Sequence, residues 1–486
     1  MNRRKAIQQI GFGVSAGLIL PSWLSSCKDF DPKPAIQYDG IVAIIGAGAA
    51  GLYAADILQA KGISVKVFEA SGRVGGRIKN LHQNDLATDA LLFDPTNFPN
   101  NDFPTELGAE RIIGGDSVWA KIVNELKIPT VQSSILGTDN YFLDAAFAEG
   151  SVASLDAAFI AAKNFVNQLA SYSGGNVSVQ QAIQNESINA RVHAILNSWL
   201  GNSYLTSNDR LGVTAMSEST SLRTRNTAQL TLKQNPMEDA LTSRFSAIVP
   251  NVELNTVIQS INYTGEKILL TGLQNGEPFS QEADKVIVAV PISILKASDI
   301  VFSPALPSAK TTALSRMGMD ACIRLVFEYK ANFWGASSGF LFGGVQASEY
   351  FNTGIGRSQY TKTMNITIAG PKAEQLSALG SGMIPVVLEE LDSIFSGKAT
   401  QNIRRDDDNN MVTVIQDWTK EPFIKGGTSY IKTGGTNQDR INLAMPVGEK
   451  LFFAGEATDV SGDAATINGA LLSAERVAQE LIDTII

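Results

Sequence analysis

The chain has 486 residues and a hydrophobic content of 44%, which is enough for full cores and too long for one simple domain. Its formal net charge of −9 argues against a nucleic-acid partner, because contact with phosphates requires a dense lysine and arginine surface. The sequence holds two histidines, His82 and His193, and two cysteines, Cys27 and Cys322. They leave almost nothing for a histidine-rich metal site, a disulfide framework or a Ser-His-Asp triad, so we expect no metal and chemistry that depends on a cofactor.

Residues 1–26 have the pattern of an export signal, and residues 27–39 that of a polar tether. A basic start with Arg3 and Arg4 precedes a short apolar run that cannot span a bilayer. The paired arginines resemble a twin-arginine signal, and the segment ending at Cys27 resembles a bacterial lipobox, whose cysteine carries the lipid. We therefore expect an exported bacterial protein, periplasmic or held at the outer membrane or cell surface through Cys27. A plain cleaved signal with an incidental cysteine is the alternative.

Beyond residue 40 the hydrophobic pattern is that of an α/β protein. Residues 41–45 form an apolar run typical of a buried parallel strand, a helix follows to about Lys61, and residues 65–69 form a second strand. Further elements in chain order are helices near 118–126, 157–169 and 190–200, strands within 252–272 and at 285–290 and 321–329, a helix at 385–395, a strand at 451–456 and a terminal helix at 466–482. The composition differs between 116 and 237, which indicates one domain interrupted by another.

A glycine fingerprint lies between the first strand and the first helix. Gly46 allows a tight turn, Gly48 lets the backbone approach a pyrophosphate, and Gly51 lets the helix pack on the strand. The helix N-terminus attracts phosphates through its free N–H groups and its dipole. Glu69 ends the second strand, where an acid accepts hydrogen bonds from a ribose. Strand, glycines, helix, strand and acid in this order predict dinucleotide binding.

A second motif follows directly and favours FAD over NAD. Gly75 and Gly76 permit close approach of the backbone, and Arg73 and Arg77 can neutralise a pyrophosphate. A simple NAD-binding domain does not need this second anchor.

A third motif lies near the C-terminus. The strand ending at Gly455 and Glu456, followed by a small-residue helix start at Thr466 and Ile467, makes a second anion-binding end. It can meet the ribityl chain and the pyrimidine side of a flavin, and core packing is the alternative.

These three motifs in this order resemble the flavin-containing amine oxidase superfamily, which includes monoamine, polyamine and L-amino-acid oxidases. The resemblance implies an α/β fold, in which a Rossmann-type FAD-binding domain is interrupted by an α+β substrate-binding domain with an antiparallel sheet. We expect FAD-binding segments at 40–115, 238–300 and 415–486. We expect the substrate domain at 116–237, mostly helical, and at 301–414.

The resemblance also implies the cofactor contacts. The segment from Glu106 to Arg111 is similar to the family's loop beside the flavin, and Val257 is similar to a valine whose backbone meets the adenine. The residues expected to bind FAD are Gly46, Gly48, Ala50, Gly51, Glu69, Ala70, Arg73, Gly76, Arg77, Gly108, Ala109, Glu110, Arg111, Val257, Trp418, Gly455, Glu456, Thr466 and Ile467.

The expected catalytic residues are Tyr430, Cys322 and Trp418. Trp418 and Tyr430 resemble the segment that closes the substrate side, where Tyr430 supplies one aromatic wall and Thr466 stands in place of the second. Cys322 stands where the family usually has a lysine that holds a water at flavin N5, which predicts slow reaction of the reduced flavin with oxygen. Ser429 stands where some members have the cysteine that links flavin covalently, so we expect non-covalent FAD.

These observations predict an FAD-dependent oxidoreductase that takes a hydride from the carbon beside nitrogen in a small amine or amino acid and releases an imine. Two alternatives remain. One is a flavin-dependent desaturase or isomerase of an apolar substrate, and the other is a non-catalytic flavin-binding lipoprotein. A small cavity with a polar end would favour the amine, whereas a long, open, apolar cavity would favour the desaturase.

Overall fold

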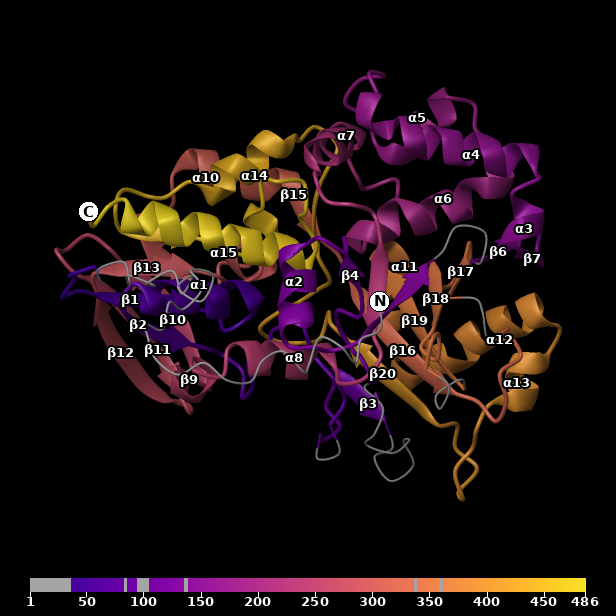
Figure 1. Ribbon diagram of the computed structural model, residues 1–486, viewed down its shortest axis with the longest axis horizontal. Helices are drawn as coiled ribbons and strands as arrows, with labels where there is room; N and C mark the ends of the chain where they lie inside the picture. The colour runs from indigo at the N-terminus through magenta and orange to yellow at the C-terminus, as the bar shows by residue number, and fades with distance from the viewer. Residues whose placement is uncertain (1–35, 83–84, 94–104, 135–138, 336–338, 358–361) are drawn as a thin grey trace, which may run out of the picture.

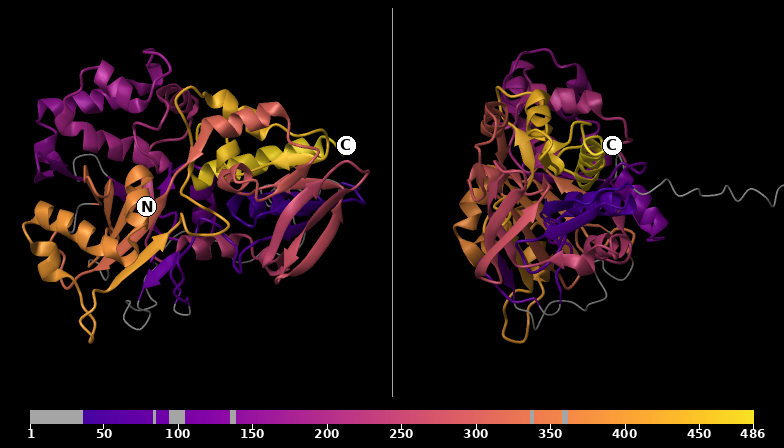
Figure 2. Two further views of the ribbon diagram at one scale, coloured as in Figure 1. Left: turned by 180° about the vertical axis from the view of Figure 1, so that it is seen from behind. Right: turned by 90° about the vertical axis from the view of Figure 1, so that its left-hand side faces the viewer.

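The computed structural model describes residues 36–82, 85–93, 105–134, 139–335, 339–357 and 362–486. The expected export signal and lipidation site at Cys27 lie outside these residues, as does most of the tether. Two units stand side by side, one built on a parallel sheet and one on a large, mainly antiparallel sheet (Figure 1). The view from behind shows the same division (Figure 2). Within the described residues no helix is long and apolar enough to cross a membrane.

A five-stranded parallel sheet forms the centre of the first unit. Its order is β22-β13-β1-β2-β9, with strands Leu451–Phe453, Lys285–Val288, Ile41–Ile45, Ser64–Phe68 and Val252–Glu253. Such a sheet is stable only when both faces are covered, which explains the continuous apolar runs in the sequence. Helices α1 (Ala49–Ala60) and α15 (Ile467–Ile482) cover one face, where Leu52 and Leu471 belong to the same core.

A four-stranded sheet covers the opposite face of the parallel sheet. Its order is β12-β11-β10-β14, with strands Glu277–Ala283, Ile268–Gln274, Thr256–Asn262 and Val301–Ser303. Ile258 and Leu270 pack there against Ile45 and Val288. The carboxyl ends of β1 and β2 are thereby fixed between two layers, which positions the glycine fingerprint.

An eight-stranded sheet forms the second unit. Its order is β3-β20-β16-β19-β18-β17-β6-β7, with strands Leu91–Phe93, Thr413–Asp417, Cys322–Glu328, Thr363–Ala369, Glu349–Asn352, Phe340–Phe342, Asn140–Leu143 and Ala146–Glu149. Successive side chains of a strand face opposite sides of the sheet. On β16, Ile323 and Leu325 pack against the core of helix α12 (Met383–Phe395), whereas Cys322 and Arg324 face the other way.

The remaining elements cap or connect these sheets. Helices α4 (Ala157–Gln168), α5 (Val179–Asn185) and α6 (His193–Trp199) form a layer over the β6–β17 end of the large sheet (Figure 1). The other elements are α2 (Val118–Glu125), α3 (Gly150–Ala153), α7 (Val213–Leu222), α8 (Met237–Arg244), α9 (Ile292–Lys296), α10 (Ser308–Arg316), α11 (Gly370–Ser377), α13 (Lys398–Asn402) and α14 (Asn437–Ala444), the sheet β4-β8-β5 (Ile112–Ile113, Gln229–Leu232, Thr130–Ser134) and the pair β15-β21 (Met317–Met319, Ser429–Ile431).

The expected mixed fold is confirmed, with local differences. Helix α2, which we placed with the substrate domain, packs through Trp119 and Val123 into the core shared by α1 and α15. The stretch from 116 to 237 also contains four strands among its helices, of which β8 joins β4 and β5. These strands escape sequence reasoning because each has only four or five residues, and β5 and β8 also pair with each other across about a hundred residues of chain.

Candidate active site

One cavity of about 960 Å³ is lined by residues of both units. Nearly all residues that the sequence predicted for the site line it, although they come from distant segments. They are Gly46, Gly48, Ala50, Glu69, Ala70, Arg73, Gly76, Arg77, Gly108, Ala109, Glu110, Arg111, Val257, Cys322, Trp418, Gly455, Glu456, Thr466 and Ile467. Gly51 and Tyr430 are not part of this lining.

The glycine fingerprint forms a cradle in which each glycine has a separate role. A Cβ atom on Gly48 would meet nothing within 4 Å, so the backbone is open to the cavity there. A Cβ atom on Gly51 would lie 1.9 Å from the carbonyl oxygen of Gly46, which is why the helix can pack on the turn only with glycine. Gly46 itself has a φ of +103°, a conformation that favours glycine. The N-terminus of α1 thus presents unhindered backbone N–H groups to an anion.

Glu69 is fixed at the end of β2. One carboxylate oxygen accepts a hydrogen bond from the Ala47 N–H at 2.8 Å, and the other accepts from the N–H and hydroxyl of Ser71. The side chain is buried beside the cavity, with 8% of its surface exposed. Since each carboxylate oxygen has two lone pairs, the group retains acceptor capacity for ribose hydroxyls.

The two arginines of the second motif are held differently from our expectation. Arg73 directs its guanidinium at the carbonyl oxygens of Val74, Ile78 and Gly76, and therefore braces its own loop. Arg77 donates to the Gly427 carbonyl and pairs with Glu456 at 2.8 Å. Both line the cavity, but these contacts engage part of their donor capacity within the protein.

Glu456 connects three segments at the cavity wall. Besides Arg77, it accepts hydrogen bonds from the N–H and hydroxyl of Ser429 and from the Ala465 N–H. Burial opposes its charge, but the nearby Arg77 and Arg440 guanidiniums hold its pKa below the usual value. The charged carboxylate therefore ties the segment before α15 to Arg77 and to Ser429 of β21.

The N-terminus of α15 forms the second cradle. Gly455, with a φ of +118°, also has open space where a Cβ would stand. Thr466 caps the helix by accepting from the Gly469 N–H at 3.0 Å and donates to the Asp463 carbonyl. Thr466 and Ile467 both line the cavity.

Cys322 and Trp418 form a buried part of the cavity wall, packed with Ile424. The indole of Trp418 donates to the Leu107 carbonyl at 2.8 Å, which fixes the ring. Burial raises the pKa of the Cys322 thiol to about 12, so the thiol is neutral at neutral pH. Lys425 is the one lysine among the described lining residues, and it pairs with Asp299.

Tyr430 is placed behind the wall, against our expectation that its ring lines the substrate side. Its side chain is 2% exposed, its ring lies where a Cβ on Gly318 would stand, and its hydroxyl donates to Asp320 at 2.9 Å. The pairing of β15 with β21 holds it there. Sequence similarity located the residue near the site but gave no information on which side of the strand faces the cavity.

Sequence reasoning missed a set of polar residues in the cavity lining. Arg223, Arg225, Thr227 and Gln229 all line the cavity, and the residues between them do not. This alternation is that of an extended chain, and it leads directly into β8. The period-two spacing of two arginines before a strand was the signal that could have identified them.

The family of the chain follows from comparison with known proteins. The model of the flavin containing amine oxidoreductase family matches residues 49–249 and 239–482. The chain belongs to this family.

Curated relatives of this amine oxidoreductase include lysine-specific histone demethylase 1 homolog 3 of Arabidopsis thaliana, 23% identical over 94% of the chain. Another is lysine-specific histone demethylase 1B of Mus musculus, 24% identical over 50% of the chain. The matches cover only 30% and 29% of those relatives' own lengths.

Solved structures support the fold of the amine oxidoreductase along almost its whole length. Putrescine oxidase bound to putrescine matches 91% of the chain and 99% of its own, with a TM-score of 0.74 and 19% identity. Cyclohexylamine oxidase from Brevibacterium oxydans IH-35A matches 92% of the chain and 99% of its own, with a TM-score of 0.73 and 20% identity.

The cofactor of the amine oxidoreductase is FAD, and the residues present fit it. Two helix N-termini and two glycines with open Cβ positions, Gly48 and Gly455, face one cavity at the upper end of the size range of ligand sites. Glu69 stands at the ribose position of the fingerprint. In the parts of the chain that the structure describes, no cluster of His, Cys, Asp or Glu could hold a metal ion.

Proposed function

We propose that the chain oxidises the C–N bond of a small amine to an imine, which water then hydrolyses to a carbonyl compound and ammonia or a smaller amine. FAD held by Gly48, Gly455 and Glu69 would supply the hydride acceptor for the carbon beside nitrogen, and the C=N bond would form as the nitrogen loses a proton. The observation that carries the proposal is that a single cavity joins the dinucleotide cradle to a polar lining from the second unit.

The chain's own residues contribute position and a dry environment. The substrate carbon must come within about 3–3.5 Å of the acceptor atom, which requires a rigid wall opposite the flavin. Trp418, fixed by its hydrogen bond to Leu107, and buried Cys322 supply such a wall. The neutral thiol offers no positive charge to the reaction of reduced flavin with oxygen. This favours slow re-oxidation by oxygen and a different final electron acceptor.

A small amine fits the cavity better than a histone tail. A histone tail is strongly cationic, whereas the described carboxylates Glu110 and Glu349 of the cavity lining are each paired with an arginine, at 3.6 Å and 3.0 Å. Putrescine oxidase and cyclohexylamine oxidase, which share the fold over nearly the whole chain, are named for small amines.

The test is an anaerobic screen of the FAD-loaded protein with primary amines, secondary amines and amino acids. The proposal predicts that at least one compound bleaches the visible flavin band and yields a carbonyl product. Failure of every compound, together with bleaching by an apolar polyene or steroid, would replace the proposal with a desaturase function. Failure of all compounds in protein that dithionite reduces normally would indicate a non-catalytic flavoprotein.

A further inference from the structure

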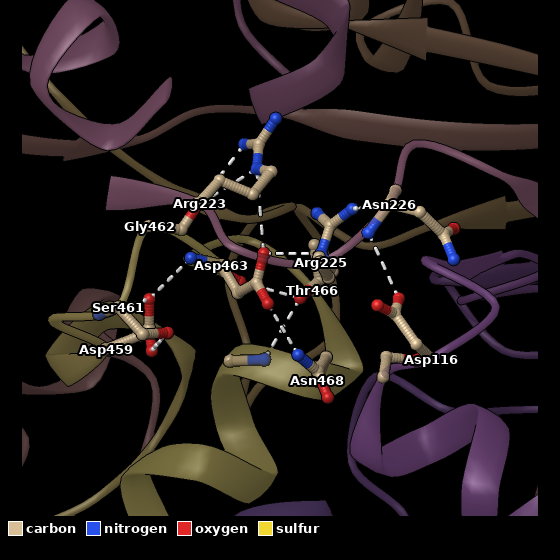
Figure 3. Close-up of polar contacts among 12 residues, drawn as sticks. Asp116, Arg223, Arg225, Asn226, Asp459, Ser461, Gly462, Asp463, Thr466 and Asn468 are labelled. Carbon is tan, nitrogen blue, oxygen red and sulfur yellow. Dashed lines mark hydrogen bonds and ion pairs between the residues drawn. The ribbon is translucent and has the colours of Figure 1, made fainter. Parts of the chain in front are cut away.

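Two arginines of the cavity lining converge on one carboxylate. The Nε atom of Arg225 lies 2.5 Å from an oxygen of Asp463, and the Nε atom of Arg223 lies 3.6 Å from the same oxygen. Arg223 also donates to the Gly462 carbonyl. Figure 3 shows that both guanidiniums reach Asp463. The arginines lie in the segment before β8, and Asp463 lies just before the start of α15. Two positive charges therefore share one negative charge.

Most other charged side chains of the described lining have one group of opposite charge beside them, whereas Arg223 and Arg225 have one carboxylate between them. Among the described residues of the lining, the pairs are Arg77 with Glu456, Arg111 with Glu349, Arg324 with Glu110, and Lys425 with Asp299. Arg73 and Glu421 pair with Glu238 and Lys79 outside the lining, and Glu69 accepts hydrogen bonds from Ala47 and Ser71. The two nearby carboxylates in Figure 3 are engaged elsewhere. Asp116 accepts from the Asn226 N–H at 3.0 Å, and Asp459 accepts from Ser461 and the Asp463 N–H in its own turn.

Two glycines, Gly114 and Gly462, leave the space in which the two arginines pack. A Cβ on Gly114 would lie 2.6 Å from Cδ of Arg225, so the arginine stem passes directly over this glycine. A Cβ on Gly462 would lie 2.4 Å from the Ser219 carbonyl and 3.0 Å from the Arg223 N–H. The side chain of Arg225 is only 6% exposed, and that of Arg223 is 26% exposed. The positive charge therefore extends from the partly open Arg223 to the buried Arg225.

Burying a cation is unfavourable when it must share its only carboxylate with a second cation, unless a further anion pairs with it. Other contacts already hold the segment before β8 in place. The Asn226 side chain accepts a hydrogen bond from the Gly115 N–H, and the Asn226 N–H donates to Asp116. A second arginine is therefore not needed to fix this segment. We propose that Arg223 and Arg225 bind an acidic group of the substrate, so that the substrate class is amines that carry a carboxylate, such as amino acids. This inference rests on the proposed amine oxidation.

The first test measures binding without turnover. Benzoate and its uncharged isostere benzamide are titrated into oxidised, FAD-loaded protein, and the perturbation of the flavin spectrum is followed. We expect clear preference for benzoate, and loss of about 30-fold or more in benzoate affinity in Arg225→Gln, as for one partner of a buried charged pair. Arg223→Gln should lose affinity to a lesser degree, and Arg225→Lys should retain part of it. Equal binding of the two probes to the wild type would overturn the inference.

The second test uses matched substrates that differ only in the carboxylate, such as phenylalanine with phenethylamine and leucine with isopentylamine. The inference predicts higher kcat/KM for the acid of each reactive pair, and a rise in KM without a comparable fall in kcat in Arg225→Gln. Faster turnover of the simple amines, with Arg225→Gln unchanged, would refute the carboxylate site and leave the amine oxidation intact. If no compound reduces the flavin, the proposed function fails while the benzoate titration still decides on the anion site.

A matched control is Arg191→Gln. Arg191 also bridges two carboxylates, Asp144 and Asp156, but it lies on the surface and outside the cavity lining. Arg191→Gln should leave the affinities for benzoate and benzamide, and the kcat/KM values of the matched substrates, unchanged. FAD content and Tm are measured for every variant. Loss of FAD from Arg225→Gln would assign the arginine to the cofactor site and overturn the inference.

Discussion

Replacement of Gly48 by valine tests whether the open glycine belongs to the FAD cradle. The backbone at Gly48 has φ −75° and ψ −177°, which any residue adopts, and nothing lies within 4 Å of the Cβ position. We therefore expect Gly48→Val to fold normally without FAD, with a change in stability within about 1 kcal/mol, as for a change at a helix N-cap. The new side chain instead stands where the pyrophosphate must approach the N–H groups of α1.

The expected loss in FAD affinity follows from the hydrogen bonds that the phosphate would lose. A hydrogen bond to a charged group contributes about 1.5–3 kcal/mol, so the loss of two weakens FAD binding by about 100-fold or more. Bound ligand stabilises a protein by about 2.7 kcal/mol at 100 times its Kd, so the variant should also lose the rise in Tm that added FAD gives the wild type. The assay is titration of apoprotein with FAD, followed by flavin fluorescence and Tm.

Gly382→Val is the matched control. Gly382 also precedes a helix, α12, and the nearest atom to its Cβ position lies at 3.6 Å, but it is outside the cavity lining. It should bind FAD like the wild type. A Gly48→Val protein that purifies yellow with full FAD content would refute the cradle. A variant that is unfolded even as apoprotein would refute the claim that the position is open.

Four further predictions address other parts of the account. Stopped-flow mixing of substrate-reduced protein with oxygen should show slow re-oxidation. Cys322→Lys should accelerate it if the buried wall accommodates the longer side chain. A wild-type rate equal to that of lysine-bearing relatives would contradict this role of the thiol. Burial lowers the pKa of Lys310 from 10.5 to about 7, so the unfolded chain binds more protons between these values and the free energy of unfolding should rise with pH there, a slope that Lys310→Met should remove. Acid precipitation should release all flavin into the supernatant, and colour in the pellet would reveal a covalent link. Cys27→Ser should release the protein from the membrane fraction and a double Arg3→Lys, Arg4→Lys variant should block its export, whereas unchanged behaviour in both would favour a plain secretory signal.

The sequence was most informative where structure is determined by neighbours in the chain. The turn from β1 through Gly46 and Gly48 into α1, and the acid at Glu69, follow from local backbone requirements, so their roles could be derived from spacing alone. The strand β16 was also predictable, because residues of different character alternate along its sequence even though almost the whole strand is buried.

Contacts between distant segments could not be derived in this way. Arg77 appeared free for a phosphate, yet it pairs with Glu456, 379 residues away. Tyr430 appeared to face the substrate, yet the pairing of β21 with β15 directs it at Asp320. The joint role of Arg223 and Arg225 depends on Asp463, which no local pattern connects to them. Such partners are determined by packing of the two units, which single-sequence patterns do not report.

The chemistry proposed for the cavity is FAD-dependent oxidation of a C–N bond. The most direct measurement is an anaerobic single turnover with the best substrate of the screen, in which flavin reduction, carbonyl product and released ammonia or amine are all quantified. The account predicts equal amounts of reduced flavin, carbonyl product and released nitrogen. Reduced flavin accompanied by an alkene product, with no nitrogen released, would contradict it.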